Sequence, residues 1–163
     1  MIRSPVSLKE GGATPSFRVR PGRRGDAGAI STLLSELGFP DSADSSTVAW
    51  VISHPEMEII VAGDAQDRPI GVLTLSHRPQ LRMKGRLATI DELVVNHAWR
   101  RKGVGRALVR KAIDRAKVLS VKRLELHVTV AEGQSEEKFY EACGFRKVNT
   151  SIFRLTEVDF EKA

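Results

Sequence analysis

The sequence of 163 residues contains a single cysteine, Cys143, and only 6% aromatic residues. One cysteine cannot form an internal disulfide, which excludes the disulfide-rich secreted scaffolds and leads us to expect a reducing, cytoplasmic location. Long apolar runs are also missing, because the longest cover only a few residues, such as 59–62, so we expect no membrane span. Residues 1–16 have no apolar stretch of the kind that a secretory signal needs.

Basic residues are absent from one part of the chain and abundant in another. Between Gly25 and Asp67 there is no Lys or Arg but there are eight acidic residues, a net charge of −8. Between Arg82 and Arg123 thirteen bases and three acids give a net charge of +10. We expect a chain polarised in this way to present one surface to an anion and another to a neutral or cationic molecule.

The pattern of apolar residues indicates one domain with its own core. We expect a loose tail over residues 1–16 and a single domain over residues 17–160. Alternating, β-branched segments predict strands, and apolar residues repeating every 3.6 positions predict helices. The expected strands cover residues 16–20, 58–65, 69–76, 87–95, 123–130 and 146–156, and the expected helices residues 26–37, 45–53, 103–119 and 135–143. This order predicts an α/β fold with a mixed, mostly antiparallel sheet flanked by helices.

The most informative segment connects an expected strand that ends near Val95 to a helix that begins at Gly103. Free N–H groups at a helix N-terminus bind anions, and glycines let a phosphate approach the backbone closely. Three adjacent bases, Arg100, Arg101 and Lys102, add charge for the same ligand and favour a phosphate loop over a purely structural turn. The loop has neither the Gly-Lys-Ser/Thr of a Walker motif nor the third glycine of a dinucleotide fingerprint.

The pattern Arg-x-x-Gly-x-Gly, here residues 100–105, resembles the acetyl-CoA loop of the GNAT superfamily of N-acetyltransferases. Two further segments are similar to the same family: the acidic strand IDELVV at 90–95 and the helix end FYEACGF at 139–145. The resemblance covers about residues 17–155 and implies a sheet whose central strands splay apart, with the thioester in the gap. The residues that it places at acetyl-CoA are Leu93, Val94, Val95, Arg100, Arg101, Lys102, Gly103, Val104, Gly105, Arg106, Gln134 and Tyr140.

Acetyl transfer to an amine needs a base that takes the amine proton and an acid that protonates the leaving thiolate. Asp91 and Glu92 are the candidate bases. Strand alternation predicts that they point to opposite faces, with Glu92 on the face of Ile90 and Val94. The position of Asp91 relative to Arg100 matches the acidic residue that more frequently acts as catalyst in the family, which slightly favours Asp91 as the base. Glu92 and an ordered water remain alternatives.

Tyr140 matches the tyrosine of the family whose hydroxyl lies near the CoA sulfur. A phenol with a pKa of about 10 can donate a proton to a developing thiolate. Packing beside Phe139 and Phe145 is the alternative role for this side chain. Gly133 replaces the Asn or Arg that the family often has seven residues before the tyrosine, and Gln134 is expected to make that CoA contact instead. The four histidines lack metal-ligand spacing, so no metal is expected.

Three functions remain open: an enzyme that acetylates a small-molecule amine, an acetyltransferase for a protein lysine or N-terminus, and, from another class, a basic nucleic-acid-binding module or a non-catalytic acetyl-CoA sensor. The shortage of aromatics among the bases argues against nucleic acid. The resemblance implies that the acidic segment 25–67 overlaps one lip of the acceptor cleft, which favours a cationic amine, whereas the bases of segment 82–86 favour an anionic one. The sequence does not identify the acceptor, and it does not distinguish a monomer from a homodimer.

Overall fold

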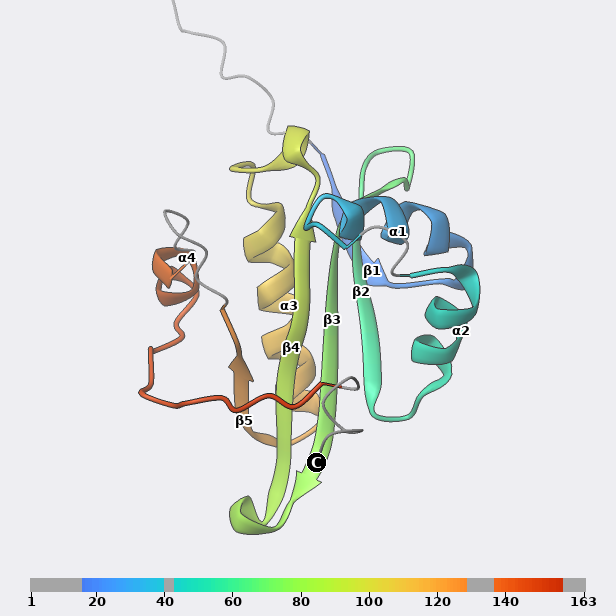
Figure 1. Ribbon diagram of the computed structural model, residues 1–163. Coiled ribbons are helices and arrows are strands. Elements are labelled where there is room, and N and C mark those ends of the chain that lie inside the picture. Colours follow the sequence, from blue (N-terminus) through green and yellow to red (C-terminus); the bar gives the residue numbers. More distant parts are fainter. Residues whose placement is uncertain (1–15, 40–42, 129–136, 157–163) are drawn as a thin grey trace, which may run out of the picture. The chain divides into compact units, whose positions relative to one another are not determined.

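The computed structural model describes residues 16–39, 43–128 and 137–156. These residues fall into two compact units, of which the first ends at His127 and the second begins at Val128. The whole sheet and the first three α-helices belong to the first unit (Figure 1). The expected N-terminal tail, apart from Ser16, and Gln134 lie outside the described residues.

Five strands form one sheet in the order β1-β2-β3-β4-β5. Neighbouring strands are antiparallel from β1 to β4, whereas β4 and β5 are parallel. The strands are β1 (Arg18–Pro21), β2 (Met57–Gly63), β3 (Pro69–Gln80), β4 (Gly85–Val95) and β5 (Val121–Leu126). The predicted mixed, mostly antiparallel sheet is therefore confirmed. Its parallel pair is joined by the helix α3 (Val104–Val118), the kind of crossover that parallel strands require.

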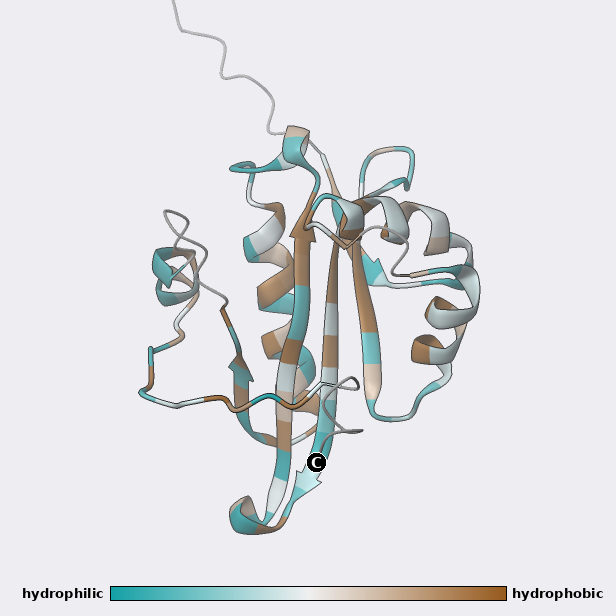
Figure 2. Ribbon diagram, in the orientation of Figure 1, coloured by the Kyte–Doolittle hydropathy of each residue, from teal (hydrophilic) through white to brown (hydrophobic). Residues whose placement is uncertain are grey.

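The helices α1 (Ala27–Ser35) and α2 (Ser45–Ser53) cover one face of the sheet. Ile30 of α1 and Val48 of α2 belong to one buried cluster with Val61 and Val72 of the sheet, because these apolar positions alternate along the strands. Figure 2 shows the apolar colour along much of β2 and β4. This packing fixes the sheet on which the candidate site is built.

The opposite face of the sheet holds α3 very close to β3, and a glycine makes this approach possible. A Cβ added at Gly71 would lie 3.1 Å from Leu108 Cδ1 and 3.2 Å from Val104 Cγ1. A glycine inside a strand often marks a place where another part of the chain comes close. Gly71 thus positions the first turn of α3 against the sheet.

Three local predictions differ from the structure. The sequence predicts Ser45 or Ser46 as the N-cap of α2, but the side chain of Asp44 caps this helix instead by accepting from Thr47 N–H at 2.7 Å. The hairpin of β3 and β4 is longer than predicted and turns through the 3-10 helix η2 (Leu81–Met83), with Lys84 in the left-handed region.

The predicted strands over residues 146–156 are wrong, because the described residues 143–156 contain no strand. Their β-branched and apolar composition suggested strands, and Val148, Ile152, Phe153 and Leu155 are exposed instead. The run Asn149-Thr150-Ser151 interrupts apolar alternation, and a strand also needs a hydrogen-bonding partner that composition cannot supply. The second unit contains the short helix α4 (Glu137–Ala142).

Candidate functional site

The two parallel strands of the sheet separate partway along β4. Their pairing ends at Ile90 and Leu126, while β4 continues to Val95 paired only with β3. From Asp91 to Val95, β4 therefore has an open edge on the β5 side, within the described part of the chain. Separated strands of this kind were the geometry that the sequence resemblance implied.

The direction of the backbone groups along this open edge follows from one hydrogen bond. Asn96 N–H donates to Ile70 O at 2.9 Å, so Asn96 faces β3. Along an antiparallel pair, alternate residues turn their N–H and C=O groups to opposite sides. The backbone groups of Val94 therefore face β3, and those of Leu93 and Val95 face the open edge.

A β-bulge lies at the start of this open edge. Thr74 of β3 pairs with Glu92, and Leu75 pairs with Ile90, so Asp91 is the unpaired extra residue. Since Thr74 and Leu75 point to opposite faces, their partners Glu92 and Ile90 do so too. The prediction that Glu92 shares a face with Ile90 is therefore wrong, because regular alternation stops at the bulge.

The same bulge overturns the prediction that Asp91 and Glu92 point to opposite faces. The carboxylate of Asp91 hydrogen-bonds to Ser76, which lies two residues from Thr74 and hence on the face of Thr74 and Glu92. Both carboxylates thus lie on one side of the sheet. They are neighbours at the point where β4 and β5 separate.

The surroundings raise the pKa of both carboxyl groups. For Asp91, loss of hydration raises the pKa, and the hydrogen bonds from Ser76 and the charges of Arg78 and His127 oppose this in part. For Glu92, loss of hydration raises the pKa and the negative charge of Asp91 adds to it. A carboxylate with a raised pKa is a stronger base, so either group can accept a proton from an amine.

The loop after β4 leads into a helix start that no side chain caps. Gly103 has a φ of 86°, gives α3 no side-chain cap, and has nothing within 4 Å of the place where a Cβ would lie. The helical hydrogen bonds begin with Ala107 N–H donating to Gly103 O at 3.0 Å. The N–H groups of the first turn, from Val104 to Arg106, are those that a helix leaves without intrahelical acceptors. This is the geometry that a phosphate group needs.

The three loop bases behave differently. Arg100 Nε donates to Val95 O at 3.1 Å, so the guanidinium braces the end of β4. Lys102 Nζ lies 5.4 Å from the ring centroid of Trp99, within the range of a cation–π contact. Arg101 has a φ of 62° and makes no hydrogen bond or ion pair with any described residue. Arg101 is therefore the base best able to meet a phosphate.

Tyr140 lies on α4 in the second unit, where its ring packs against two other aromatics. The ring centroids are 5.0 Å from Phe139 and 6.1 Å from Phe145, both edge to face. The packing predicted as the alternative role is thus observed, and the role of the hydroxyl stays a prediction.

Sequence reasoning missed four residues that shape the site. The strand register, which the sequence does not show, lets Ser76 hydrogen-bond to Asp91 and lets the charge of His127 act on it. Glu36 contacts the loop from the end of α1. Gly71 alone had a local signal, a glycine within a strongly apolar strand.

The acidic residues of segment 25–67 are largely occupied by the protein itself. Each described member makes a hydrogen bond or ion pair within the chain: Asp26, Glu36, Asp44, Glu56, Glu58, Asp64 and Asp67. Each of them except Asp44 has an Arg side chain within 4.0 Å, which cancels part of its negative field, so the expected attraction of this segment for a cationic acceptor is weakened.

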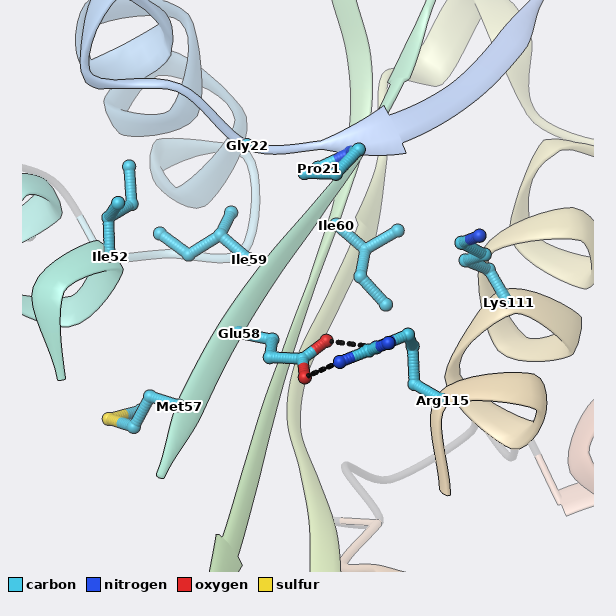
Figure 3. Close-up of a pocket in the computed structure, with 9 residues that line it drawn as sticks. All are labelled: Pro21, Gly22, Ile52, Met57, Glu58, Ile59, Ile60, Lys111 and Arg115. Carbon is cyan, nitrogen blue, oxygen red and sulfur yellow. Dashed lines mark hydrogen bonds and ion pairs between the residues drawn. The ribbon is translucent and has the colours of Figure 1, made fainter. Parts of the chain in front are cut away.

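A hollow of about 400 Å³ lies elsewhere, at the outer edge of β2 beyond the end of β1 (Figure 3). Glu58 and Arg115 face each other there and form a two-pronged ion pair at 2.6 and 2.7 Å. None of the predicted site residues lines this hollow. In the described part of the chain, no cluster of three or more His, Cys, Asp or Glu could hold a metal ion, and no helix has both the length and the apolar character needed to cross a membrane.

Comparison with known proteins agrees with this geometry. Solved structures of similar fold include a glucosamine-6-phosphate N-acetyltransferase from Arabidopsis thaliana, 19% identical, with a TM-score of 0.76 over 87% of this chain and 99% of that one. An acetyltransferase from Trypanosoma brucei is 22% identical, with a TM-score of 0.72 over 86% and 99% of the two chains. An aminoglycoside acetyltransferase from an uncultured soil metagenomic sample is 16% identical, with a TM-score of 0.70 over 86% and 97%.

No curated protein matches the sequence. The model of the acetyltransferase (GNAT) family matches residues 29–145, well over half of the sequence. The matched range contains β4, the loop after it and the first turn of α3, which are the parts that form the open edge and the uncapped helix start. The chain therefore belongs to the acetyltransferase (GNAT) family.

Proposed function

We propose that the protein transfers an acetyl group from acetyl-CoA directly to a primary amine of a small molecule. The observation that supports this most strongly is the continuity of two features on one short segment. The open edge of β4 ends at Val95, and the uncapped start of α3 follows at Gly103. A ligand with an amide-containing arm and a pyrophosphate fits this pair of features.

The residues of the segment divide between the two parts of acetyl-CoA. The N–H groups of the α3 first turn, Val104 to Arg106, would hold the pyrophosphate, with Arg101 adding positive charge. The backbone groups of Leu93 and the N–H of Val95 would pair with the pantetheine arm, since Arg100 already occupies Val95 O. Acetyl-CoA supplies the activated thioester.

Asp91 is the proposed base. Only a neutral amine is nucleophilic, so the ammonium must first lose a proton, and the raised pKa of Asp91 suits the carboxylate to receive it. Ser76 holds this carboxylate in place. Glu92 on the same face and an ordered water are the alternatives. Tyr140 is the proposed acid that protonates the departing thiolate.

The proposed acceptor is a cationic amine. Support now comes from Asp91 and Glu92, two neighbouring carboxylates on one face, rather than from the acidic segment 25–67. Such a pair attracts positive charge at short range. The second candidate, a protein lysine or N-terminus, shares the same amine chemistry.

The test combines binding with turnover. We expect acetyl-CoA to raise the melting temperature of the protein, and thiol release to appear with a subset of a panel of small amines matched in size but cationic or anionic. Release only with lysine-containing peptides would support the protein-acetylating alternative. Binding without release for any amine or peptide would indicate an acetyl-CoA sensor, and no binding at all would overturn the proposal.

A further inference from the structure

Glu36 connects α1 to the loop that follows β4. It is the residue directly after α1, and its carboxylate reaches across to the segment 96–100. Oε1 accepts from Asn96 Nδ2 at 2.8 Å, and Oε2 accepts from His97 N–H at 3.1 Å. Arg100 Nη2 lies 4.0 Å from the same carboxylate. One side chain thus contacts the first two residues of this segment and the last.

The contacts made by Glu36 continue into the loop. Asn96 Oδ1 accepts from Ala98 N–H at 3.1 Å and so caps the 3-10 helix η3 (His97–Trp99). Arg100, at the other end of η3, uses its Nε to hold Val95 O. Segment 96–100 is therefore fixed at both ends, and Glu36 is its anchor outside the loop.

The residues that follow this anchor have an uncommon backbone. Arg101 and Gly103 have φ values of 62° and 86°, in the left-handed region. For a residue with a side chain this conformation persists only where the surroundings determine it, and such residues concentrate at ligand sites. The side chain of Arg101 has no described partner that could fix it. The constraint comes from the two neighbouring segments: the first turn of α3, which packs on the sheet through Val104, and the segment just before Arg101, which Glu36 holds.

We propose that Glu36 is a positioning residue for the anion-binding loop: by holding segment 96–100 it sets the direction in which the first turn of α3 presents its N–H groups to the pyrophosphate of CoA. Arg100 then acts as a brace of the loop and not as a phosphate ligand. The inference rests on the proposed function, since it concerns how the same site is held ready for its cosubstrate.

Calorimetric binding of CoA to purified variants tests this role. We expect Glu36→Ala to weaken CoA binding on the order of tenfold, because two hydrogen bonds and an ion pair are lost. Glu36→Gln should also weaken binding, since an amide cannot accept at both positions. The rate at saturating acetyl-CoA should change less than twofold, because Glu36 touches none of the residues proposed to move protons.

Glu58→Gln is the matched control. It removes a carboxylate with a comparable ion pair, to Arg115, but at the hollow beside β2 and outside the loop. This variant should bind CoA like the wild type. Melting curves of all variants separate a loss of folding from a loss of binding, and the isosteric Glu36→Gln replaces Glu36→Ala if the latter does not fold.

The outcomes distinguish this inference from the proposed function. Wild-type affinity in both Glu36 variants, with CoA bound by the wild type, overturns the positioning role and leaves the proposed function intact. A fall in the saturated rate with unchanged CoA affinity also overturns it. A wild-type protein that does not bind CoA overturns both.

Discussion

Asp91 and Glu92 lie on the same face of the sheet, because Asp91 is the unpaired residue of the bulge that opposes Thr74 and Leu75. Two adjacent carboxylates cannot both ionise without repulsion, and the charge of Asp91 contributes to the raised pKa of Glu92. The negative charge of Asp91 therefore makes Glu92 easier to protonate.

We predict that Asp91→Asn lowers kcat/KM by about 10²- to 10⁴-fold, the usual contribution of a general base. In the wild type Asp91 can act as a base only when it is ionised, and its pKa is raised. The activity should therefore increase as the pH rises through that pKa. Measurement of kcat/KM against pH checks both points. Glu92→Gln is the control and should keep most of the activity. A large loss in Glu92→Gln together with an active Asp91→Asn would assign the base to Glu92.

Where the signal was local, the sequence predicted the backbone geometry of the candidate site. The uncapped glycine helix start and its bases form one continuous segment, so spacing alone located them. The bulge at Asp91 depends on how β3 aligns with β4, and strand alternation within one segment cannot show a skipped residue. Glu36 and His97 are 61 residues apart, and nothing in either neighbourhood indicates the contact. Both the bulge and this contact depend on strand register and long-range packing, which local sequence patterns do not contain.

Gly103→Val should weaken acetyl-CoA binding at least tenfold, about 1.4 kcal/mol. The φ of 86° at Gly103 is unfavourable for a β-branched residue, and the open space beside it is where a phosphate would approach. Calorimetry with acetyl-CoA measures the change. Gly25→Val is the control, because Gly25 has equally open surroundings without a positive φ. Wild-type affinity in a folded Gly103→Val variant would rule out this loop as the binding site.

Gly71→Ala should both destabilise the protein and weaken acetyl-CoA binding. The new methyl group would lie 3.1 Å from Leu108 Cδ1 and from Val94 O, so α3 or β4 must shift. Overpacking of this kind costs about 1–3 kcal/mol, and a displaced first turn of α3 no longer aims its N–H groups correctly. Denaturant unfolding and calorimetry check the two effects. Gly28→Ala, inside α1 with no neighbour near its Cβ position, should be neutral or stabilising.

The buried ion pair of Arg20 and Asp26 predicts a loss of stability in acid. Arg20 Nη1 and Nη2 donate to the carboxylate at 2.8 and 2.9 Å. Burial acts to raise the pKa of Asp26, but the hydrogen bonds from Arg20 and from Arg23 N–H outweigh it and hold the pKa below its usual 3.8. A lowered folded-state pKa stabilises the protein above the unfolded value and stops doing so as pH falls through the folded one.

Below about pH 4 the melting temperature should therefore decrease steadily. The hydrogen bond from Arg20 lowers the pKa of Asp67 to about 2. Protonation of Asp67 therefore continues the decrease of the melting temperature down to about that pH. Asp26→Asn should cost about 1–3 kcal/mol at pH 7, because Arg20 stays buried with Asp67 as its remaining ionic partner, and should show a flatter acid profile. The matched change Asp114→Asn affects a surface pair with Lys117, in which both side chains are exposed, and should matter far less. Equal acid sensitivity in the wild type and Asp26→Asn would contradict the role of the buried pair.

Tyr140→Phe should lower turnover far more than it changes acetyl-CoA affinity. Phenylalanine keeps the edge-to-face packing with Phe139 and Phe145, so this substitution removes the hydroxyl and little else. A proton donor matters as charge builds on the leaving sulfur, and its loss costs about 10²- to 10⁴-fold in rate while ground-state binding is kept. The comparison is kcat at saturating acetyl-CoA against the dissociation constant of acetyl-CoA.

Phe139→Leu is the control, because it disturbs the aromatic packing with the hydroxyl in place and should reduce stability rather than turnover. If Tyr140→Phe turns over like the wild type while Phe139→Leu is destabilised, Tyr140 acts through packing alone, and the thiolate must take its proton from another group or from water.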